Sequence, residues 1–366
     1  PHVRVGHRQA PKTKAPEQKL RGFVFALRKA KLAWPGDAGI IAPFDHSGAG
    51  MQVALLRLLA DGRFHSGETL GHVLGLSRAA VWKQLQKLSE AYSLDLQRVP
   101  GKGYRLAAPL ALLDADKLAA AGVPIDLLWS ATSTNSLALQ ALEKKRAAPF
   151  AILAEQQSAG RGRRGRSWEG GFAENLYLTY VHEIHGGAAR IEGASLAVGV
   201  ALVRVLRAHG ILRAQLKWPN DVLVAGRKLA GILIELSGDL ADSCRLVIGI
   251  GVNINKQQAQ AIDQPWTSCY RELGVRVERT AFAVDLLREL AATLELFARD
   301  GFAAFRHEWH EMAAWLGEAV EVSGFQGASG RLVGVDERGA LLLATQEGER
   351  VFAGGEVSLR RSEHDS

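Results

Sequence analysis

Apolar positions recur at helical spacing just after residue 50 and then give way to alternation. Ser66 and Ser77 each precede an apolar run and are suited to cap a helix. Gly75 lies between the two runs, so the pattern predicts a tight turn there. Two helices joined by a tight turn and followed by a hairpin wing are typical of a winged helix-turn-helix domain. The predicted elements are helices over residues 53–59, 66–74 and 77–88, and strands over residues 94–99 and from residue 104.

The third predicted helix is rich in hydrogen-bond donors, which favours DNA as its partner. Residues 51–105 hold eight Lys/Arg against four Asp/Glu, which agrees with this interpretation. A three-helix protein-binding domain is the alternative. Trp82 is bulky for a helix that reads bases, so which bases are read stays open. The candidate DNA-binding residues are Arg78, Lys83, Gln84 and Lys87 in the helix and Lys102 at the tip of the wing.

The next part of the chain alternates between short apolar runs and longer helical patterns, which predicts a mixed α/β sheet. The helix predicted over residues 194–208 is apolar on nearly every side up to Arg204, so we expect it to be buried. Predicted strands cover residues 150–154, 176–181, 214–218, 229–236 and 246–252, and predicted helices cover residues 135–143, 194–208, 283–297 and 302–314.

Past Trp315 the pattern changes to short alternating strands with glycine turns, which is typical of a small β-barrel of the SH3-like kind. These strands are predicted over residues 319–323, 331–336, 340–345, 349–352 and 356–360. We therefore expect an α+β protein. Its predicted domains are a winged helix-turn-helix over residues 51–111, a mixed α/β domain over residues 112–314 and the barrel over residues 315–366.

The basic excess is confined to the first hundred residues. Residues 1–50 hold nine Lys/Arg against three Asp/Glu and show no sustained periodicity. Met51 is the first methionine, so we expect an over-extended start, with translation beginning at Met51; a disordered basic arm is the alternative. Beyond residue 105 there are 28 Lys/Arg against 31 Asp/Glu, which suggests DNA binding at one end of the chain and another activity at the other.

Composition excludes several classes of protein. The 366 residues suffice for two or three domains. No apolar run reaches the roughly 18 to 20 residues that a membrane span needs, so we expect no membrane partner. Cys244 and Cys269 have no CxxC spacing, so neither a disulfide framework nor a zinc site is expected. This cysteine usage fits a reducing cytoplasm.

The clearest chemical signal is the run GRGRRGRSW at residues 160–168. Glycine lets a backbone approach a ligand closely, and arginine offers a planar fork of donors for phosphate or carboxylate oxygens. The run therefore predicts a loop that closes over an anion, with Trp168 able to cover a planar group such as a base. A solvated basic loop, or an arginine-rich segment that binds nucleic acid, is the alternative.

Five further motifs accompany this run. They are STN at residues 133–135, EQQ at 155–157, KWPND at 217–221, KLAGILIE at 228–235 and GIGVNIN at 249–255. In this order the set closely resembles the biotin–protein ligases, and residues 51–361 resemble the bifunctional kind that is also the biotin operon repressor. The resemblance implies a class II synthetase-like central domain. It also implies that ATP activates biotin as biotinyl-5'-AMP, and that biotin then passes to a lysine of a carboxylase carrier domain.

Such a reaction needs cations that bring two anions together and stabilise charge in the transition state. The resemblance places Arg161 and Arg163 in the ligand-closing loop, and Lys217 at the lysine that meets both the biotin carboxylate and the phosphate. Lys228 would be a second lysine near the phosphate; for Lys217 the alternative is a surface charge at a strand end. Asp221 either carries Mg²⁺ for ATP or caps the turn before it.

The resemblance also implies a pocket for biotin and its adenylate. Gly249 and Gly251 end a β-branched strand, where a missing side chain leaves room for a ligand; tight strand packing is the alternative. Asn135 stands at a predicted helix start, where it could equally be a cap. The implied binding residues are Ser133, Thr134, Asn135, Gln157, Gly160, Arg161, Gly162, Arg163, Trp168, Lys217, Gly249, Gly251, Asn253 at the adenine and Trp266 in a second loop over the adenylate.

The implied partners are the biotin carboxyl carrier domain of acetyl-CoA carboxylase or a similar enzyme, operator DNA, and a second copy of the chain when the adenylate is bound. His182 and His185 lie outside the motifs and are expected at the surface, so no histidine base stands out for the carrier lysine. Two other functions stay open: a biotin-sensing DNA-binding regulator without transfer activity, and a ligase for a related acyl cofactor such as lipoate. The intact arginines and lysines speak against the first, and the motifs at residues 160–166 and 217–221 favour biotin.

Overall fold

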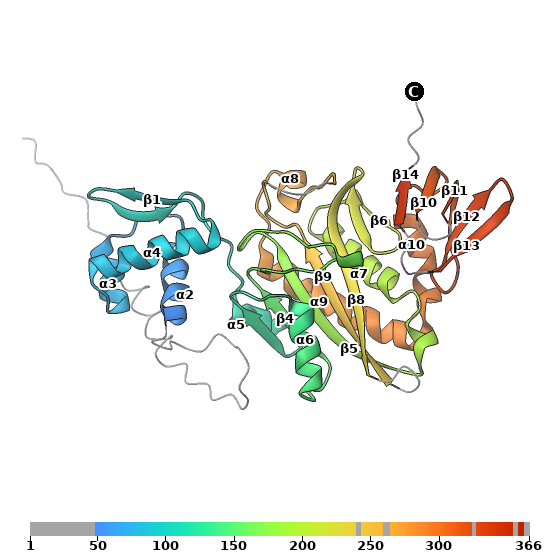
Figure 1. The fold of residues 1–366 in the computed structure, drawn as a ribbon, viewed down its shortest axis with the longest axis horizontal. Helices are drawn as coiled ribbons and strands as arrows, with labels where there is room; N and C mark the ends of the chain where they lie inside the picture. Colours follow the sequence, from blue (N-terminus) through green and yellow to red (C-terminus); the bar gives the residue numbers. More distant parts are fainter. Residues whose placement is uncertain (1–47, 239–242, 259–263, 324–326, 354–357, 362–366) are drawn as a thin grey trace, which may run out of the picture. The chain divides into compact units, whose positions relative to one another are not determined.

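The computed structural model describes residues 48–238, 243–258, 264–323, 327–353 and 358–361, and the chain divides into two compact units, Pro1–Pro109 and Leu110–Ser366 (Figure 1). The expectation about the translation start concerns residues 1–50, of which residues 1–47 lie outside this described part. No helix within the described residues is long and apolar enough to cross a membrane.

Within residues 48–109, the described part of the first unit, three helices and a two-stranded antiparallel hairpin form, as predicted for a winged helix-turn-helix. Ser66 and Ser77 cap the second and third helices by accepting hydrogen bonds from Thr69 N at 2.9 Å and Ala80 N at 3.2 Å. Gly75 adopts a left-handed conformation between these helices, which suits a residue without Cβ. The elements are α2 (Gly48–Leu59), α3 (Gly67–Leu74), α4 (Arg78–Tyr92), β1 (Leu96–Val99) and β2 (Gly103–Leu106).

Trp82 connects the third helix to the wing. Its ring stacks on Tyr104 of β2, with ring centroids 5.5 Å apart, and the Arg98 guanidinium lies 5.0 Å from the Trp82 ring. Tyr104 is buried, so the stack is part of the core of this unit. The bulk of Trp82 therefore has a structural reason, which the sequence pattern alone does not provide.

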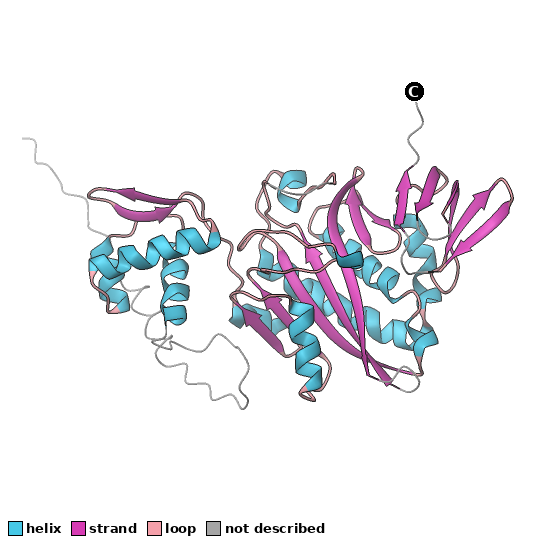
Figure 2. Ribbon diagram, in the orientation of Figure 1, coloured by secondary structure: helices cyan, strands magenta, loops and turns pink. Residues whose placement is uncertain are grey.

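Among its described residues, the second unit is built on a seven-stranded mixed sheet in the order β3-β4-β5-β9-β8-β7-β6. Strands are drawn in magenta in Figure 2. The β3–β4 pair is parallel and the other pairs are antiparallel. The sequence pattern does not predict β3 or β7. The strands are β3 (Ile125–Leu128), β4 (Phe150–Ala154), β5 (Leu176–His185), β6 (Ala214–Lys217), β7 (Asp221–Val224), β8 (Arg227–Gly238) and β9 (Ser243–Val252).

Helices cover both faces of this sheet (Figure 1). On one face, α6 (Thr134–Glu143) packs Ala138 and Leu142 against Phe150 and Val181. On the other, α7 (Ala194–Ala208) packs beside α9 (Arg279–Asp300), and 11 of the 15 residues of α7 are buried, as its apolar pattern predicts. The prediction of a single helix over residues 302–314 is wrong in detail. A 3₁₀ turn over Phe302–Phe305 comes first, and a shorter α-helix follows it. Elsewhere in the described part of this unit the α-helices are α5 (Ala115–Leu118), α8 (Cys269–Leu273) and α10 (Arg306–Met312).

The C-terminal part is a five-stranded antiparallel sheet in the order β13-β12-β11-β10-β14, which confirms the β-rich end of the predicted α+β fold. Trp218 Nε1 donates a hydrogen bond to Gly339 O at 3.1 Å and so ties this sheet to the turn after β6. The strand predicted over residues 356–360 lies partly outside the described residues. The strands are β10 (Ala319–Ser323), β11 (Ala328–Val335), β12 (Leu341–Thr345), β13 (Gly348–Phe352) and β14 (Ser358–Arg361).

Candidate active site

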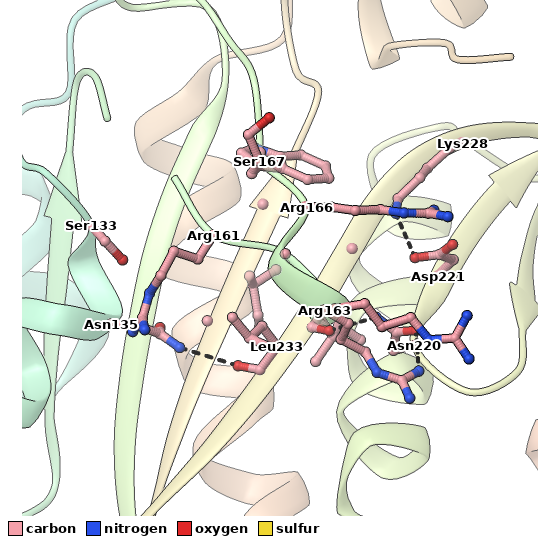
Figure 3. Close-up of a pocket in the computed structure, with 18 of the residues that line it drawn as sticks. Ser133, Asn135, Arg161, Arg163, Arg166, Ser167, Asn220, Asp221, Lys228 and Leu233 are labelled. Atoms are coloured by element: carbon pink, nitrogen blue, oxygen red, sulfur yellow. Dashed lines mark hydrogen bonds and ion pairs between the residues drawn. The ribbon is translucent and has the colours of Figure 1, made fainter. Parts of the chain in front are cut away.

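The arginine-glycine run forms a short hairpin on the face of the sheet that carries α6. Arg161 and Ser167 pair as an antiparallel bridge, and Trp168 N donates to Gly160 O at 2.8 Å. A Cβ on Gly160 would lie 2.6 Å from Trp168 O, so the close approach requires glycine. In this arrangement the arginine side chains extend over the sheet toward separate partners (Figure 3).

One carboxylate holds two lysines at the turn between β6 and β7. Asp221 Oδ1 lies 2.7 Å from Lys228 Nζ, and Asp221 Oδ2 lies 4.0 Å from Lys217 Nζ. A dashed line in Figure 3 marks the ion pair between Asp221 and Lys228. All three side chains are less than a fifth exposed. Burial lowers the pKa of Lys217; Asp221 opposes this shift and Lys228 adds to it. The cluster is therefore a partly desolvated, net positive group.

Asn220 joins this turn to the arginine hairpin. Its Oδ1 accepts a hydrogen bond from Arg163 Nη1 at 3.0 Å, and both residues are labelled in Figure 3. The Asn220 Nδ2 donates to Ile232 O at 2.8 Å. Burial, followed by the nearby charge of Arg164, lowers the pKa of Arg163. The hydrogen bond to Asn220 thus holds the guanidinium of Arg163 at the turn that carries Asp221, although Asn220 is not among the predicted site residues.

Ser133, Thr134 and Asn135 form the start of α6. The Ser133 hydroxyl is the N-cap and accepts from Ser136 N at 3.4 Å, so the alternative of Asn135 as the cap is wrong. Gln157 Oε1 accepts from Thr134 N at 2.7 Å and from Thr134 Oγ1 at 3.1 Å. These contacts hold Gln157 against the first turn of the helix, on the wall of the cavity that these residues line.

Thr179 and Glu235, which are not among the predicted site residues, extend these contacts across the sheet. Thr179 Oγ1 donates to Asn135 Oδ1 at 2.6 Å, and Asn135 Nδ2 donates to Glu235 Oε2 at 2.8 Å. The same Glu235 oxygen accepts from Arg161 Nη2 at 2.8 Å. A continuous set of polar contacts therefore runs from the start of α6 to the arginine hairpin.

Gly249 and Gly251 of β9 face this site and make room for neighbouring side chains. A Cβ on Gly249 would lie 2.4 Å from Asn135 Oδ1, and a Cβ on Gly251 would lie 2.3 Å from the indole of Trp168. Tight packing thus accounts for both glycines in this structure, and their role toward a ligand stays a prediction. The cavity they help to line holds six cations against one carboxylate; the cations are Arg161, Arg163, Arg164, Arg166, Lys217 and Lys228.

An adjoining cavity is lined by Trp168, Trp266 and Trp315. Asn253 is buried there; its Nδ2 donates to Thr267 O at 3.0 Å, while its Oδ1 has no partner among the described residues. Aromatic faces and a buried acceptor suit a planar, hydrogen-bonding group such as a base. The charged lining consists of Arg166, Lys217, Lys228, Arg360, Glu169 and Asp221. Trp315 and Arg360 come from the C-terminal part of the chain and belong to no predicted motif.

The predicted Mg²⁺ position at Asp221 has one carboxylate, which two lysines already approach. No group of three or more His, Cys, Asp or Glu side chains that could hold a metal occurs among the described residues. A magnesium ion held by one carboxylate and by substrate phosphate oxygens needs no such group. The donor set therefore fits an ion that arrives with a nucleotide, and the assignment of Asp221 stays a prediction.

The predicted DNA-binding residues are grouped in the first unit, on α4 and at the wing. Arg78, Lys83, Lys87 and Lys102 are exposed, and Gln84 is half-buried and accepts from Gln52 Nε2 at 3.4 Å. Exposed cations on one helix and on the adjacent hairpin suit contact with phosphates. Their role in DNA binding stays a prediction.

Comparisons with known proteins agree with this geometry. Sequence models match three segments: the biotin/lipoate A/B protein ligase family at residues 128–253, an HTH domain at residues 52–105 and a biotin protein ligase C-terminal domain at residues 316–360. The chain is 39% identical to the bifunctional ligase/repressor BirA of Escherichia coli K12 over 314 residues, covering 84% of this chain and 97% of the relative.

A second curated relative is the biotin--[acetyl-CoA-carboxylase] ligase of Paracoccus denitrificans, which is 36% identical over 242 residues; the match covers 63% of this chain and 98% of the relative. Among solved structures, the biotin protein ligase from Aquifex aeolicus in complex with biotin and ATP superposes with a TM-score of 0.57 at 29% identity. This match covers 65% of the chain described here and 99% of the Aquifex chain.

Proposed function

The chain belongs to the biotin–protein ligases, and we propose that its second unit activates biotin with ATP and transfers it to a carrier lysine while its first unit binds operator DNA. The relatives that it matches over nearly their whole length combine a ligase with a repressor. The observation that carries the enzymatic half is the pair of lysines held by Asp221 next to Arg163 and the arginine hairpin.

In the first step a carboxylate oxygen of biotin forms a bond to the α-phosphorus of ATP, and pyrophosphate leaves. Both reactants are anions, so their approach is opposed until cations screen them. Lys217, Lys228 and Arg163 supply that charge from partly buried positions, where it is worth more than in water. The role of Asp221 in this proposal is to keep both ammonium groups at the turn.

In the second step the neutral ε-amine of a carrier lysine attacks the carbonyl carbon of the anhydride and forms an amide bond. The bond from that carbon to the phosphate oxygen breaks, and AMP leaves together with the surplus proton of the amine. His185 is exposed, whereas His182 is half-buried on β5, so the surface position expected for His182 is wrong. Burial lowers the pKa of His182, but its neighbours are Tyr180 and Glu295 on the face of the sheet opposite α6. We therefore propose no histidine base; the site positions the amine and excludes water.

For the regulatory half, we propose that the chain acts as a homodimer when the adenylate is bound, and that Arg78, Lys83, Gln84, Lys87 and Lys102 contact DNA. A single small module binds DNA weakly, whereas a dimer reaches two half-sites. The carrier is a carboxylase domain that carries a target lysine. We place the protein in the cytoplasm, because its two cysteines are free and buried.

One experiment tests the enzymatic proposal against both alternatives. Purified full-length protein is mixed with ATP, a biotin carrier domain and either biotin or lipoate, and carrier mass and released pyrophosphate are measured. Biotin-dependent mass gain is the expected result. Lipoylation would reassign the substrate. Biotin binding without mass gain or pyrophosphate release would leave a DNA-binding sensor.

A further inference from the structure

Lys256 is almost completely buried, which is rare for a lysine. It is 3% exposed and follows Asn255, whose side chain exchanges hydrogen bonds of 2.9 and 3.0 Å with the backbone of Val277. The carbonyl of Lys256 accepts from Ser268 Oγ at 2.6 Å. The backbone is therefore fixed on both sides, and the side chain extends inward from a defined point.

The Lys256 ammonium contacts two different segments at once. Its Nζ donates to Glu169 O at 3.2 Å and lies 5.2 Å from the centroid of the Trp266 ring. Glu169 directly follows Trp168, so both segments bring a tryptophan to the same cavity. Burial lowers the pKa of Lys256, and the carboxylates of Glu174 and Glu169 oppose that shift.

We propose that Lys256 is a positioning residue for the nucleotide part of the site, an inference that rests on the ligase function proposed above. Lys256 is not among the described residues that line the cavity, whereas Glu169 and Trp266 are. It therefore acts through them: its charge fixes the Trp266 ring and the end of the arginine hairpin, so that both stand ready for the base of ATP. Lys256 is also not among the described residues that line the cavity at the start of α6, where we propose that biotin binds, so its loss should leave that cavity unchanged.

The chain provides a matched control. The Arg271 guanidinium lies 4.6 Å from the centroid of the same Trp266 ring, but Arg271 is exposed. A solvated cation beside an aromatic ring contributes less than a desolvated one, because water competes for its charge. Removing the charge of Arg271 should therefore have a much smaller effect than removing the charge of Lys256.

The test uses Lys256→Met in the full-length chain, because methionine keeps an unbranched apolar stem and loses the charge. The KM values for ATP and for biotin are measured separately from pyrophosphate release. The KM for ATP is expected to rise about tenfold, while the KM for biotin stays within about twofold. Arg271→Met should leave both values within about twofold. An equal rise of both KM values in Lys256→Met would overturn the proposal.

A double variant shows whether Lys256 acts through Trp266. Lys256→Met added to Trp266→Leu should raise the KM for ATP little beyond that of Trp266→Leu alone; multiplied effects would contradict the proposal. If Lys256→Met does not fold, Lys256→Arg decides: a KM for ATP near the wild-type value supports the proposal and a tenfold rise overturns it. Failure of the ligase function itself would show earlier, as wild-type protein that releases no biotin-dependent pyrophosphate.

Discussion

The carboxylate of Glu235 binds the guanidinium of Arg161 at 2.8 Å, and this contact fixes the arginine hairpin to strand β8. The same oxygen accepts a hydrogen bond from Asn135 at the start of α6. One carboxylate thus places an arginine of the hairpin and an amide of the pocket wall relative to each other. Both Arg161 and Asn135 line the cavity in which we propose that biotin binds.

Glu235→Gln should loosen the hairpin without unfolding the sheet. The ion pair is partly exposed, and such pairs contribute about 1 kcal/mol at most, so we expect no more than about a fivefold rise in the KM for biotin. Trypsin should cleave the arginine run faster than in the wild type. Glu183→Gln, which removes a similarly exposed partner of Arg245 on the same sheet, is the control and should change neither measurement. Unchanged trypsin cleavage in Glu235→Gln would remove the carboxylate from this role.

Lys217→Ala should act on the chemical step. Lys217 is one of two amines held by Asp221, and the loss of one preorganised donor to developing charge typically lowers a rate by about 100- to 1000-fold. Biotin-dependent pyrophosphate release is the measurement. Arg227→Ala, which removes an exposed cation paired with Glu272 at the start of β8, is the control and should stay near the wild-type rate. A near-normal rate for Lys217→Ala would exclude Lys217 from catalysis.

Local periodicity of apolar residues predicts the helix-turn-helix, the burial of α7 and most strands of the central sheet. It does so because the spacing of apolar residues within a segment indicates both its secondary structure and its buried face. Contacts between distant segments do not follow from it. Arg161 and Glu235 are 74 residues apart, and Lys256 and Glu169 are 87 apart, so no local pattern relates them. The motif at residues 217–221 contains Asn220. The hydrogen bond between Asn220 and Arg163 could not be predicted from this motif, because only the folded chain brings the turn at Asn220 next to the arginine hairpin.

Arg163→Gly should impair retention of the adenylate. Arg163 ties the hairpin to Asn220 beside the lysine pair, so its loss leaves the hairpin with fewer contacts to the catalytic turn. We expect biotin activation to persist while biotinyl-5'-AMP escapes and labels lysines of unrelated proteins. Arg164→Gly is the matched control, because Arg164 is exposed and already has a positive φ of 57° that glycine accepts readily. Wild-type carrier selectivity in Arg163→Gly would show that Arg163 does not help to close the site.

Trp82→Ala should weaken DNA binding and leave the ligase unchanged. Trp82 stacks on Tyr104, so its removal loosens the wing that carries Lys102. We expect operator affinity to fall about tenfold in a gel-shift titration, because phosphate contacts depend on a fixed wing. Lys83→Ala is the comparison: loss of one phosphate contact should reduce the salt dependence of binding by about one unit of slope. Equal pyrophosphate release in the wild type, Trp82→Ala and Lys83→Ala would show that both substitutions affect only the first unit.

Biotinyl-5'-AMP should tighten both self-association and operator binding, because two inverted half-sites require two copies of the first unit. Arg161 holds the hairpin through Glu235, and Arg163 holds it through Asn220. A bound adenylate would add further contacts to these two arginines. The ordering cost of the hairpin is then met before the subunits associate, which favours association. Hydrogen exchange should slow at residues 160–168 when biotin and ATP are present. Sedimentation and gel-shift titrations should show tighter dimer and DNA binding under the same conditions, and unmodified carrier should weaken both. If neither affinity changes with the adenylate, the chain is a ligase whose DNA-binding unit does not respond to biotin.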